Sequence, residues 1–174
     1  GMSHITRDDA KTFIYAFLLG AGTGKVAQIL RVNQREAGQA VENFMESIQG
    51  LASLKKKIVP HIAKRGWFKG LDGRKVVVPS EHKTLAGMLQ NGESVIMKHS
   101  ALQWVRQAKA EGIDFKLVTW PHDEWQTEVC GTMATAEALG KLQRQSIVDT
   151  GVKFDMMCPL AGSTDIGRNW KDTH

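Results

Sequence analysis

The segment from Arg7 to Gly22 constrains the fold of this chain most, because its pattern specifies one helix with one exposed face. Arg7, Lys11 and Tyr15 recur every four residues, which places them above one another on a single side of a helix. Two cations and an aromatic ring on one face can hold a polyphosphate and stack on the group beyond it. The spacing alone, however, favours a solvated basic stripe beside a half-buried tyrosine.

The sequence also marks both ends of this helix. Thr6 and Asp9 have the three-residue spacing of a capping box, in which each side chain accepts a hydrogen bond from the other's backbone. Gly20 and Gly22 provide a stop, since glycine adopts the left-handed conformation that ends many helices. We therefore expect a helix that begins directly after Thr6.

Apolar residues at helical spacing predict most of the remaining chain to be helical. Pro60 is expected to bend or end one of these helices, and Gly92 to kink or break another. Three successive lysines, 55–57, fit a solvated helix face, with contact to a phosphate backbone as the alternative. The predicted helices are Thr23–Leu30, a helix capped by Asn33 that reaches Ile48, Leu51–Ala63, Glu81–Ala110 and Thr132–Thr150.

Two segments have the pattern of β-hairpins. Asp72-Gly73 lies between strand-like runs in Trp67–Val78, and glycine tolerates the positive backbone angles of a mirror-image turn. In the second, Phe115–Val129, strand-like runs flank a polar turn. Residues Phe154–Leu160 suggest a final strand. The predicted fold class is therefore α+β, mostly helical, with β-hairpins and a small antiparallel sheet.

Composition sets broad limits on function. The chain has 174 residues, 42% hydrophobic and 24% charged, which suits a globular domain with a real core. A net charge of +5 favours a polyanionic partner. Cys130 and Cys158 form neither a metal motif nor a disulfide framework, so we expect a reduced, cytoplasmic protein. No apolar run has the length of a membrane span, and we expect no membrane partner.

Gly1 before Met2 suggests the remnant of a cleaved tag. If Met2 is a natural start, the chain is a gene product of its own.

The residue identities of the first helix resemble a known motif. Arg-x3-Lys-x3-Tyr followed by x4-Gly is similar to motif B, the nucleotide-binding fingers helix of family A DNA polymerases, in its single-subunit phage branch. The resemblance implies that Arg7 and Lys11 bind the triphosphate of a dNTP. It also implies that Lys11 protonates the leaving pyrophosphate, and that Tyr15 stacks on the nucleotide and discriminates at its sugar.

His122-Asp123-Glu124, in the turn of the second hairpin, resembles motif C of the polymerase palm. The resemblance implies that Asp123 is a catalytic ligand of Mg²⁺, that Glu124 supports the site, and that His122 lies near the primer end. An acid at a hairpin tip is rigid and exposed, as a ligand of a hard cation must be. Without the resemblance, a charged hairpin tip with no catalytic role would be favoured.

Further matches extend the resemblance from Thr6 to His174. Gly70-Leu71-Asp72-Gly73-Arg74 is similar to the segment whose arginine contacts the primer-template backbone, which implies that role for Arg74. Gln90 aligns with a helix that passes the minor groove, so it too is expected to bind DNA. The tail, Gly167-Arg168-Asn169-Trp170 near His174, resembles the family's C-terminus.

Some residues depart from the family's pattern. Ala86 stands where the phage enzymes have asparagine, which should weaken the minor-groove contact. Ala16 and Leu19 replace the glycine and second tyrosine of motif B, which puts fidelity and template placement in doubt.

The resemblance implies a partial fingers domain in residues 2–66 and a partial palm in residues 67–174. The chain begins at motif B, so we expect it to lack motif A, the thumb and the exonuclease. Asp123 alone offers too few ligands for two metal ions, and the chain is therefore expected not to polymerise DNA by itself.

Two hypotheses follow. The chain is part of a split polymerase, completed by an N-terminal chain that carries motif A, or it is a non-catalytic remnant that binds nucleic acid or protein. Without a motif A strand, the second hairpin should expose an edge, which a homodimer could cover. A concentration-independent monomer mass in light scattering would contradict the homodimer.

Overall fold

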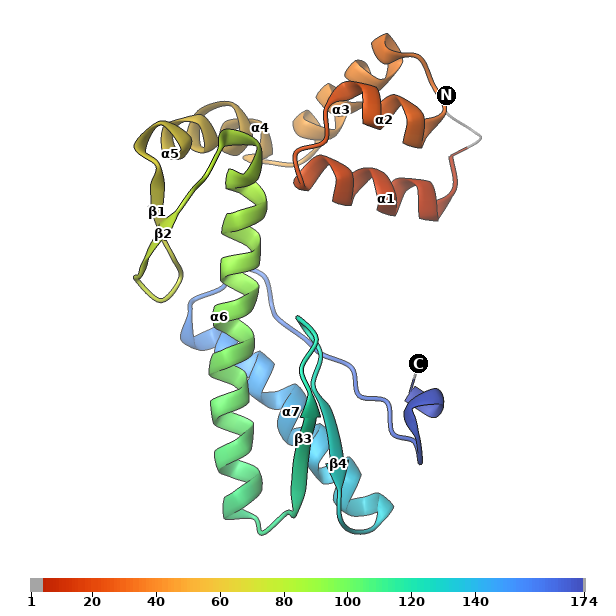
Figure 1. The fold of residues 1–174 in the computed structure, drawn as a ribbon, viewed down its shortest axis with the longest axis vertical. Helices are drawn as coiled ribbons and strands as arrows, with labels where there is room; N and C mark the ends of the chain where they lie inside the picture. Colours follow the sequence, from red (N-terminus) through yellow and green to blue (C-terminus); the bar gives the residue numbers. More distant parts are fainter. Residues whose placement is uncertain (1–4, 174) are drawn as a thin grey trace. The chain divides into compact units, whose positions relative to one another are not determined.

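The computed structural model describes residues 5–173, so Gly1, Met2 and His174 lie outside the described part. The chain forms two compact units, Gly1–Asn91 and Gly92–His174, and each is described by itself. The division of the chain at residue 66 into fingers and palm stays a prediction. The α+β expectation is confirmed, because the structure is mostly helical with two small antiparallel sheets of two strands each (Figure 1).

The first unit contains five of the α-helices, one π-helical turn (η1), one β-hairpin and the start of α6 (Figure 1). The elements are α1 (Arg7–Leu18), α2 (Thr23–Leu30), α3 (Gln34–Ser47), α4 (Leu51–Ser53), η1 (Leu54–Ile58), α5 (Val59–Arg65), β1 (Trp67–Lys69), β2 (Lys75–Val77) and α6 (Glu81–Ala110).

Both predicted helix caps of the first unit are confirmed. Thr6 and Asp9 form a capping box at the start of α1, and Asn33 and Glu36 form another at the start of α3. Each box supplies partners to backbone N–H groups that have no acceptor within the helix.

Three phenylalanines join α1 to α3. Phe13 and Phe17 are buried on α1, and each meets Phe44 of α3 edge to face, at 5.2 and 5.3 Å between ring centroids. Such pairs stabilise beyond the area that they bury. The buried side of α1 is thus fixed by aromatic contacts.

The π-helical turn places one of the three lysines differently from the prediction. Lys55 is partly buried: its Nζ lies 4.9 Å from the Phe17 ring centroid and 3.5 Å from the Phe17 carbonyl oxygen. Desolvation lowers its pKa, while the charge of Glu81 opposes that shift. The turn holds more residues than an α-helical turn, so it changes which side chains face inward. Lys56 forms an exposed ion pair with Glu42, and Lys57 is exposed.

The hairpin β1–β2 forms as predicted, with Trp67 opposite Val77 and Lys69 opposite Lys75. Its turn is not of the mirror-image type, because among residues 70–74 only Gly73 has a positive φ, of 85°. The Gly73 N–H donates to the Gly70 carbonyl, and the Gly70 N–H donates to the Arg74 carbonyl. This is a type I turn followed by a left-handed glycine, the usual form of a three-residue hairpin loop.

Replacing Gly20 by alanine is predicted to destabilise the chain. Its φ is +84°, and an added Cβ would lie 2.5 Å from the carbonyl oxygen of His82. We expect Gly20→Ala to lower the free energy of unfolding by at least about 1 kcal/mol, measured by urea denaturation. Gly87→Ala is the matched control: it lies within α6 with open space around it, and should stabilise the helix by up to about 1 kcal/mol. An equal effect of both changes would contradict the prediction.

The second unit contains the rest of α6, a β-hairpin, a long helix and a 3-10 turn (Figure 1). The helix α6 runs without interruption through Gly92, so of the predicted kink or break the break is wrong. Glycine lowers helix stability only modestly, and flanking turns compensate for it. The remaining elements are β3 (Phe115–Thr119), β4 (Gln126–Val129), α7 (Met133–Lys153) and η2 (Trp170–Thr173).

Trp104 of α6 is the centre of the core of the second unit, with no exposed surface. Leu139 of α7 and Ala101 and Ala108 of α6 are buried with it. Phe115, Trp125 and Val129 of the hairpin pack against this cluster. The core therefore attaches the β3–β4 hairpin to the two helices.

Small polar residues line the interface of α6 and α7. The Ser100 hydroxyl donates to the Thr150 hydroxyl at 2.9 Å, and both residues are buried. Nearby, Gln103 Nε2 donates to the Asp149 carboxylate. The interface is thus joined by specific hydrogen bonds as well as by apolar packing.

The predicted strand at Phe154–Leu160 is wrong. These residues follow α7 as a turn and irregular backbone, and η2 is the only regular element after α7 in the described chain. The segment packs against α7 instead of pairing with a strand: Leu160 lies against Gly151, and the Thr164 hydroxyl donates to the Gly140 carbonyl at 3.3 Å. Both glycines leave room for the close approach of this segment.

Candidate functional site

The exposed face of α1 has the composition that its spacing predicted. Arg7 and Lys11 are exposed, and Tyr15 has 57% of its surface accessible rather than being half-buried. Lys11 Nζ lies 6.0 Å from the centroid of the Tyr15 ring. The aromatic residues Phe13 and Phe17 point to the core instead. The face is therefore free to contact an anion and a ring.

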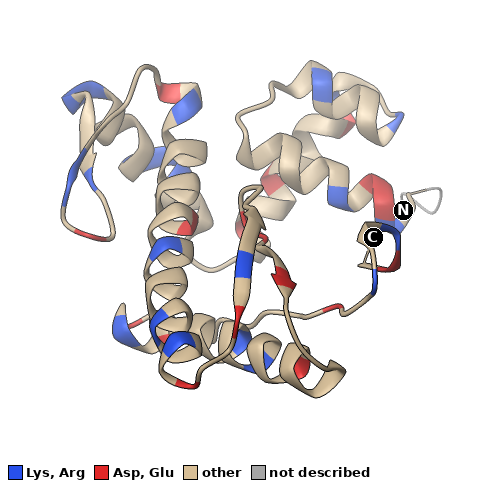
Figure 2. Cartoon of the chain, turned by 60° about the horizontal axis from the view of Figure 1, so that its bottom comes forward, with Lys and Arg blue, Asp and Glu red and all other residues tan. Residues whose placement is uncertain are grey.

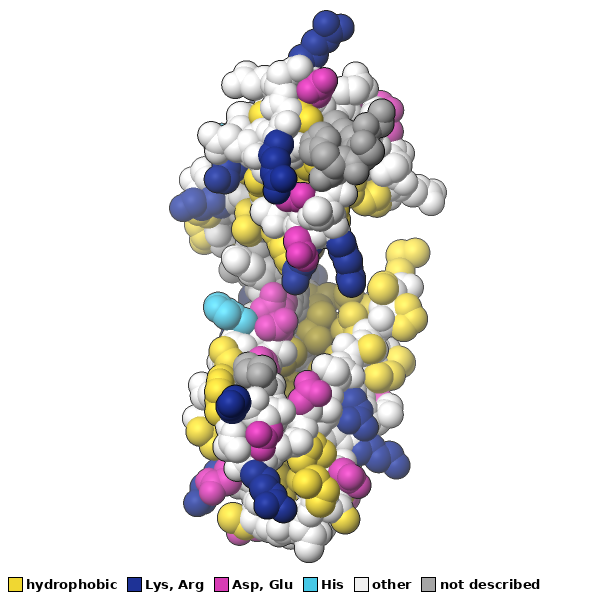
Figure 3. Space-filling model, turned by 90° about the vertical axis from the view of Figure 1, so that its right-hand side faces the viewer, with side chains coloured by type: hydrophobic (Ala, Val, Ile, Leu, Met, Phe, Trp, Pro, Cys, Tyr) yellow, Lys and Arg dark blue, Asp and Glu magenta, His cyan; other side chains and the backbone are white. Residues whose placement is uncertain are grey.

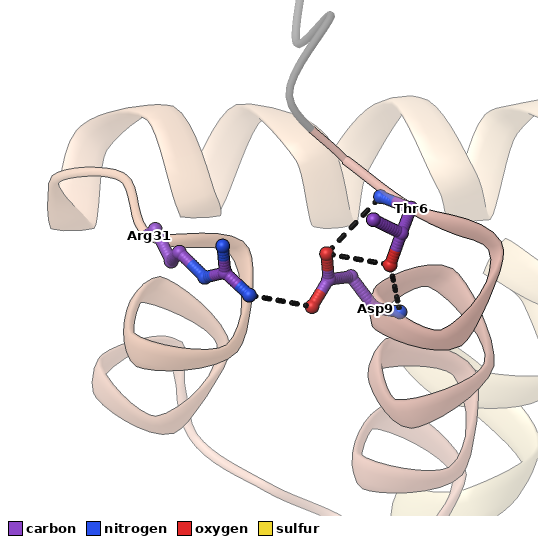
Figure 4. A network of polar contacts seen from close by, with 3 residues as sticks. All are labelled: Thr6, Asp9 and Arg31. Atoms are coloured by element: carbon purple, nitrogen blue, oxygen red, sulfur yellow. Dashed lines mark hydrogen bonds and ion pairs between the residues drawn. The ribbon is translucent and has the colours of Figure 1, made fainter.

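Asp9 holds the start of α1 in two ways (Figure 4). Its Oδ2 accepts from the Thr6 backbone N–H at 3.0 Å, and its Oδ1 accepts from Arg31 at 3.3 Å. The Thr6 hydroxyl in turn accepts from the Asp9 backbone N–H at 3.1 Å. Because Arg31 follows α2, this network joins the N-terminus of α1 to the end of the next helix.

We predict that Thr6→Ala destabilises the chain by about 1 kcal/mol, because it removes the cap of α1. Thermal unfolding measures the loss. Thr12→Ala is the matched control, since Thr12 is exposed within the same helix and alanine has the higher helix propensity. Equal melting temperatures for Thr6→Ala and the wild type would exclude a stabilising cap.

The turn between β3 and β4 presents His122 and Asp123 to solvent, with Glu124 half-buried. The Glu124 N–H donates to the Pro121 carbonyl at 3.0 Å, which closes the turn. His122 has a φ of +49°, a left-handed conformation that is unusual outside glycine. The Glu124 carboxylate accepts from Gln126 Nε2. Asp123 is thus the acid of this turn that points into solvent, whereas Glu124 is tied to the strand that follows.

Asp123 by itself is not a metal centre. Within residues 5–173, no three His, Cys, Asp or Glu side chains converge as a metal site. Mg²⁺ in proteins is bound by one or two carboxylates together with phosphate oxygens and water. The described residues therefore do not bring together a complete set of protein ligands of this kind.

Sequence reasoning missed the aromatic residues beneath this turn. Trp120 lies 6.1 Å from Trp125 between ring centroids, and Trp125 lies 5.7 Å from Trp104. The indole N–H of Trp120 donates to the His122 carbonyl at 3.1 Å. Two tryptophans flanking Pro121–Glu124 were the available signal, because large aromatic residues at both ends of a turn often anchor it.

Arg74 lies in the loop of the β1–β2 hairpin. It is exposed, and its Nε forms an ion pair with the Asp72 carboxylate at 2.5 Å. Desolvation works to raise the pKa of Asp72, but hydrogen bonds and the charge of Arg74 outweigh it, so that the pKa is lowered. The pair therefore persists at neutral pH and is lost only as the pH falls through that lowered pKa. Asp72 orients the guanidinium without covering it.

One face of this hairpin is strongly cationic. Lys69 and Lys75 lie directly opposite each other, and like charges in that position repel. Arg65 and Lys75 lie 4.2 and 5.1 Å from the ring centroid of Trp67. Figure 2 shows blue on both strands and red at the loop. A polyanion would relieve the repulsion between the two lysines.

Other parts of the surface are mixed in charge. On the face in Figure 3, Lys and Arg side chains are interspersed with Asp and Glu instead of forming one patch. Gln90 is exposed on α6.

An apolar pocket of about 430 Å³ also opens between α1, α2 and α3. It is lined by Ile5, Ala10, Phe13, Ile14, Leu30, Ala40 and Phe44.

The predicted site residues thus form separate groups. Arg7, Lys11 and Tyr15 share the face of α1, and Arg74 and Gln90 belong to other elements of the same unit. The turn 122–124 belongs to the second unit.

No helix in residues 5–173 is long and apolar enough to cross a membrane.

Comparison with known proteins identifies the family. The model of DNA polymerase family A matches residues 1–172, which is nearly the whole sequence. The chain belongs to DNA polymerase family A. It is 32% identical to the DNA-directed DNA polymerase of Enterobacteria phage T3 and 31% identical to that of Escherichia phage T7, over 97% of this chain in each case.

The polymerase fold is shared with a bacterial enzyme of known structure. This is the POL domain of Pol1 from M. smegmatis, in complex with DNA primer-template and dNTP. The two structures superpose with a TM-score of 0.74 over 83% of this chain, at 20% identity. The chain covers 27% of that structure and 27% of each of the two phage polymerases, so it spans about a quarter of these relatives.

Proposed function

We propose that this family A segment is the C-terminal part of a template-directed DNA polymerase, which acts in DNA replication together with a second chain that supplies motif A. The observation that carries the proposal is the family match along the chain, with Arg7, Lys11 and Tyr15 on one exposed helix face and Asp123 exposed at a hairpin tip. These are the side chains that the motifs assign to chemistry.

The α1 face binds the incoming dNTP in this proposal. Arg7 and Lys11 contact its triphosphate, since guanidinium and ammonium groups make strong charge-assisted hydrogen bonds to phosphate oxygens. Lys11 gives a proton to the leaving pyrophosphate. Tyr15 stacks on the nucleotide and discriminates at its sugar.

The β3–β4 turn serves the primer end. Asp123 is one carboxylate ligand of Mg²⁺, and an aspartate of the second chain completes the donor set. When bound, Mg²⁺ acts as a Lewis acid on the reacting oxygens. Glu124 supports the turn through Gln126, and His122 lies near the primer terminus.

Primer-template DNA is held by Arg74 and Gln90. The cationic face around Lys69 and Lys75 and the net charge of +5 support this part of the proposal. Neutralising phosphates releases counterions, so DNA affinity should fall steeply with salt. The M. smegmatis relative is described in complex with primer-template and dNTP.

The proposed second chain is an N-terminal polymerase chain that carries motif A. The exposed apolar side chains of β3, Leu117 and Val118, and the apolar pocket of the first unit support a protein partner. Alternatively, a second copy of this chain covers β3 in a homodimer. The proposed location is the cytoplasm of a bacterial or phage-infected cell.

Purification of the tagged chain from its source cell, with mass spectrometry of its partners, tests the proposal. A partner that carries motif A, forming a pair that extends a primer with Mg²⁺, supports it. Extension by the chain alone would overturn the requirement for a partner. A pair that binds DNA but never extends a primer would favour the alternative.

That alternative is a non-catalytic module that binds nucleic acid or protein. Ala16 and Leu19 favour it, since both depart from motif B at nucleotide-facing and template-facing positions. Retained DNA binding without dNTP binding would distinguish this module from a polymerase subunit.

A further inference from the structure

The tip of the β3–β4 hairpin holds an unfavourable backbone conformation. His122 has a φ of +49°, and in this region the Cβ of any residue other than glycine lies close to its own carbonyl oxygen. The next residue, Asp123, is exposed. Histidine adopts this left-handed conformation more often than most residues with a side chain, but it remains uncommon, so contacts around the turn should contribute to holding it.

The indole of Trp120 contacts the turn at this point. Its N–H donates to the His122 carbonyl oxygen at 3.1 Å, two residues further along the chain. Together with the bond from the Glu124 N–H to the Pro121 carbonyl, this makes two hydrogen bonds within residues 120–124. The first fixes the peptide plane between His122 and Asp123, and the second closes the turn around it.

The indole ring of Trp120 is partly exposed and packs on one side against Trp125. The interplanar angle of Trp120 and Trp125 is 67°, and Trp125 in turn contacts Trp104, which is fully buried. Among the described residues, neither the Trp104 nor the Trp125 indole N–H has a hydrogen-bond partner. Of these three rings, Trp120 is therefore the one whose N–H acts on the turn, while the other two provide packing.

We propose that Trp120 is a positioning residue: its indole N–H holds His122 in the left-handed conformation and so sets the direction of the Asp123 carboxylate. The catalytic meaning of that direction rests on the proposed function. The conformational role does not, since it concerns the hairpin alone.

Two matched variants test the conformational role. Trp120→Phe keeps an aromatic ring but removes the donor, whereas Trp125→Phe removes an N–H that bonds to no described residue. NMR of the 174-residue chain reports the backbone at His122 through its Cα and Cβ shifts. We expect Trp120→Phe to move His122 out of the left-handed range and to speed exchange of the Glu124 amide at least about tenfold. Trp125→Phe should leave His122 in place.

Unchanged His122 shifts in Trp120→Phe would overturn the proposal, and so would an equal change in Trp125→Phe. If Trp120→Phe does not fold, hydrogen exchange of the wild-type chain tests whether the Trp120 indole N–H is hydrogen-bonded. The Trp120 indole proton should then exchange at least about tenfold more slowly than that of N-acetyltryptophanamide, and equal rates would refute the hydrogen bond.

Kinetics separate this proposal from the proposed function. In the assembled polymerase, Trp120→Phe should lower kcat and leave the KM for dNTP nearly unchanged, because nucleotide contacts are made by α1. If no polymerase assembles, the proposed function fails, while the NMR result still decides the role of Trp120. A raised KM with unchanged kcat would refute the positioning of Asp123.

Discussion

Primer extension by the proposed two-chain polymerase should be lost when Asp123 is replaced by asparagine. The change is nearly isosteric and lies at an exposed turn, so the fold should be unaffected. It removes the negative charge that a hard cation requires of its ligand. Metal catalysis lowers the barrier by several kcal/mol, so its loss should reduce the rate about a thousandfold or more.

The measurement is single-nucleotide primer extension with Mg²⁺ at saturating partner chain. Asp114→Asn is the matched control, since Asp114 is also an exposed acid of the second unit but lies outside the turn. Unchanged circular dichroism for both variants shows that the fold persists. If Asp123→Asn extended primers at the wild-type rate, Asp123 would not be a metal ligand.

Truncation of Trp104 should have the largest effect on stability. Its side chain has no exposed surface and contacts both helices and the hairpin of the second unit. Trp104→Ala is expected to cost about 3–5 kcal/mol, which is comparable to the whole stability of a small unit. The hairpin should lose its anchor at the same time, because Phe115 and Trp125 pack on the same ring.

Urea denaturation followed by circular dichroism measures this loss. Leu102→Ala is the control on the same helix, with 56% of Leu102 exposed, and should cost much less. The loss of stability in Trp104→Phe should lie between the losses in Trp104→Ala and Leu102→Ala, since the Trp104 indole N–H has no partner among residues 5–173. A small effect of Trp104→Ala would mean that the hairpin is held by other contacts.

Local patterns predicted the helices well, because their signals are contained in a few neighbouring residues. The capping box at Thr6, the helix cap at Asn33 and the sites of both hairpins are examples. The family motifs likewise predicted which side chains of α1 are exposed. The roles of Arg7, Lys11, Tyr15, Arg74, Gln90, His122, Asp123 and Glu124 stay predictions.

The incorrect predictions concern residues whose conformation is decided by tertiary contacts. Phe154–Leu160 has the composition of a strand but packs against Gly151 of α7 and pairs with no strand of the described chain. Lys55 turns inward because a π-helical turn alters the phase of the helix, which apolar spacing does not reveal. The hydrogen bond from Trp120 to His122 depends on a left-handed residue that carries no sequence signal of its own.

The hydroxyl pair between α6 and α7 has a consequence for how strictly the two helices are aligned. Two apolar surfaces can slide by one turn and still exclude water, so they define a contact without defining its register. Ser100 and Thr150 do not allow this, because a slip would leave two buried hydroxyls without partners, at about 1–3 kcal/mol each. The Ser100–Thr150 hydrogen bond therefore adds little to the attraction between the helices. Its effect is to favour one register of α6 against α7 over all others.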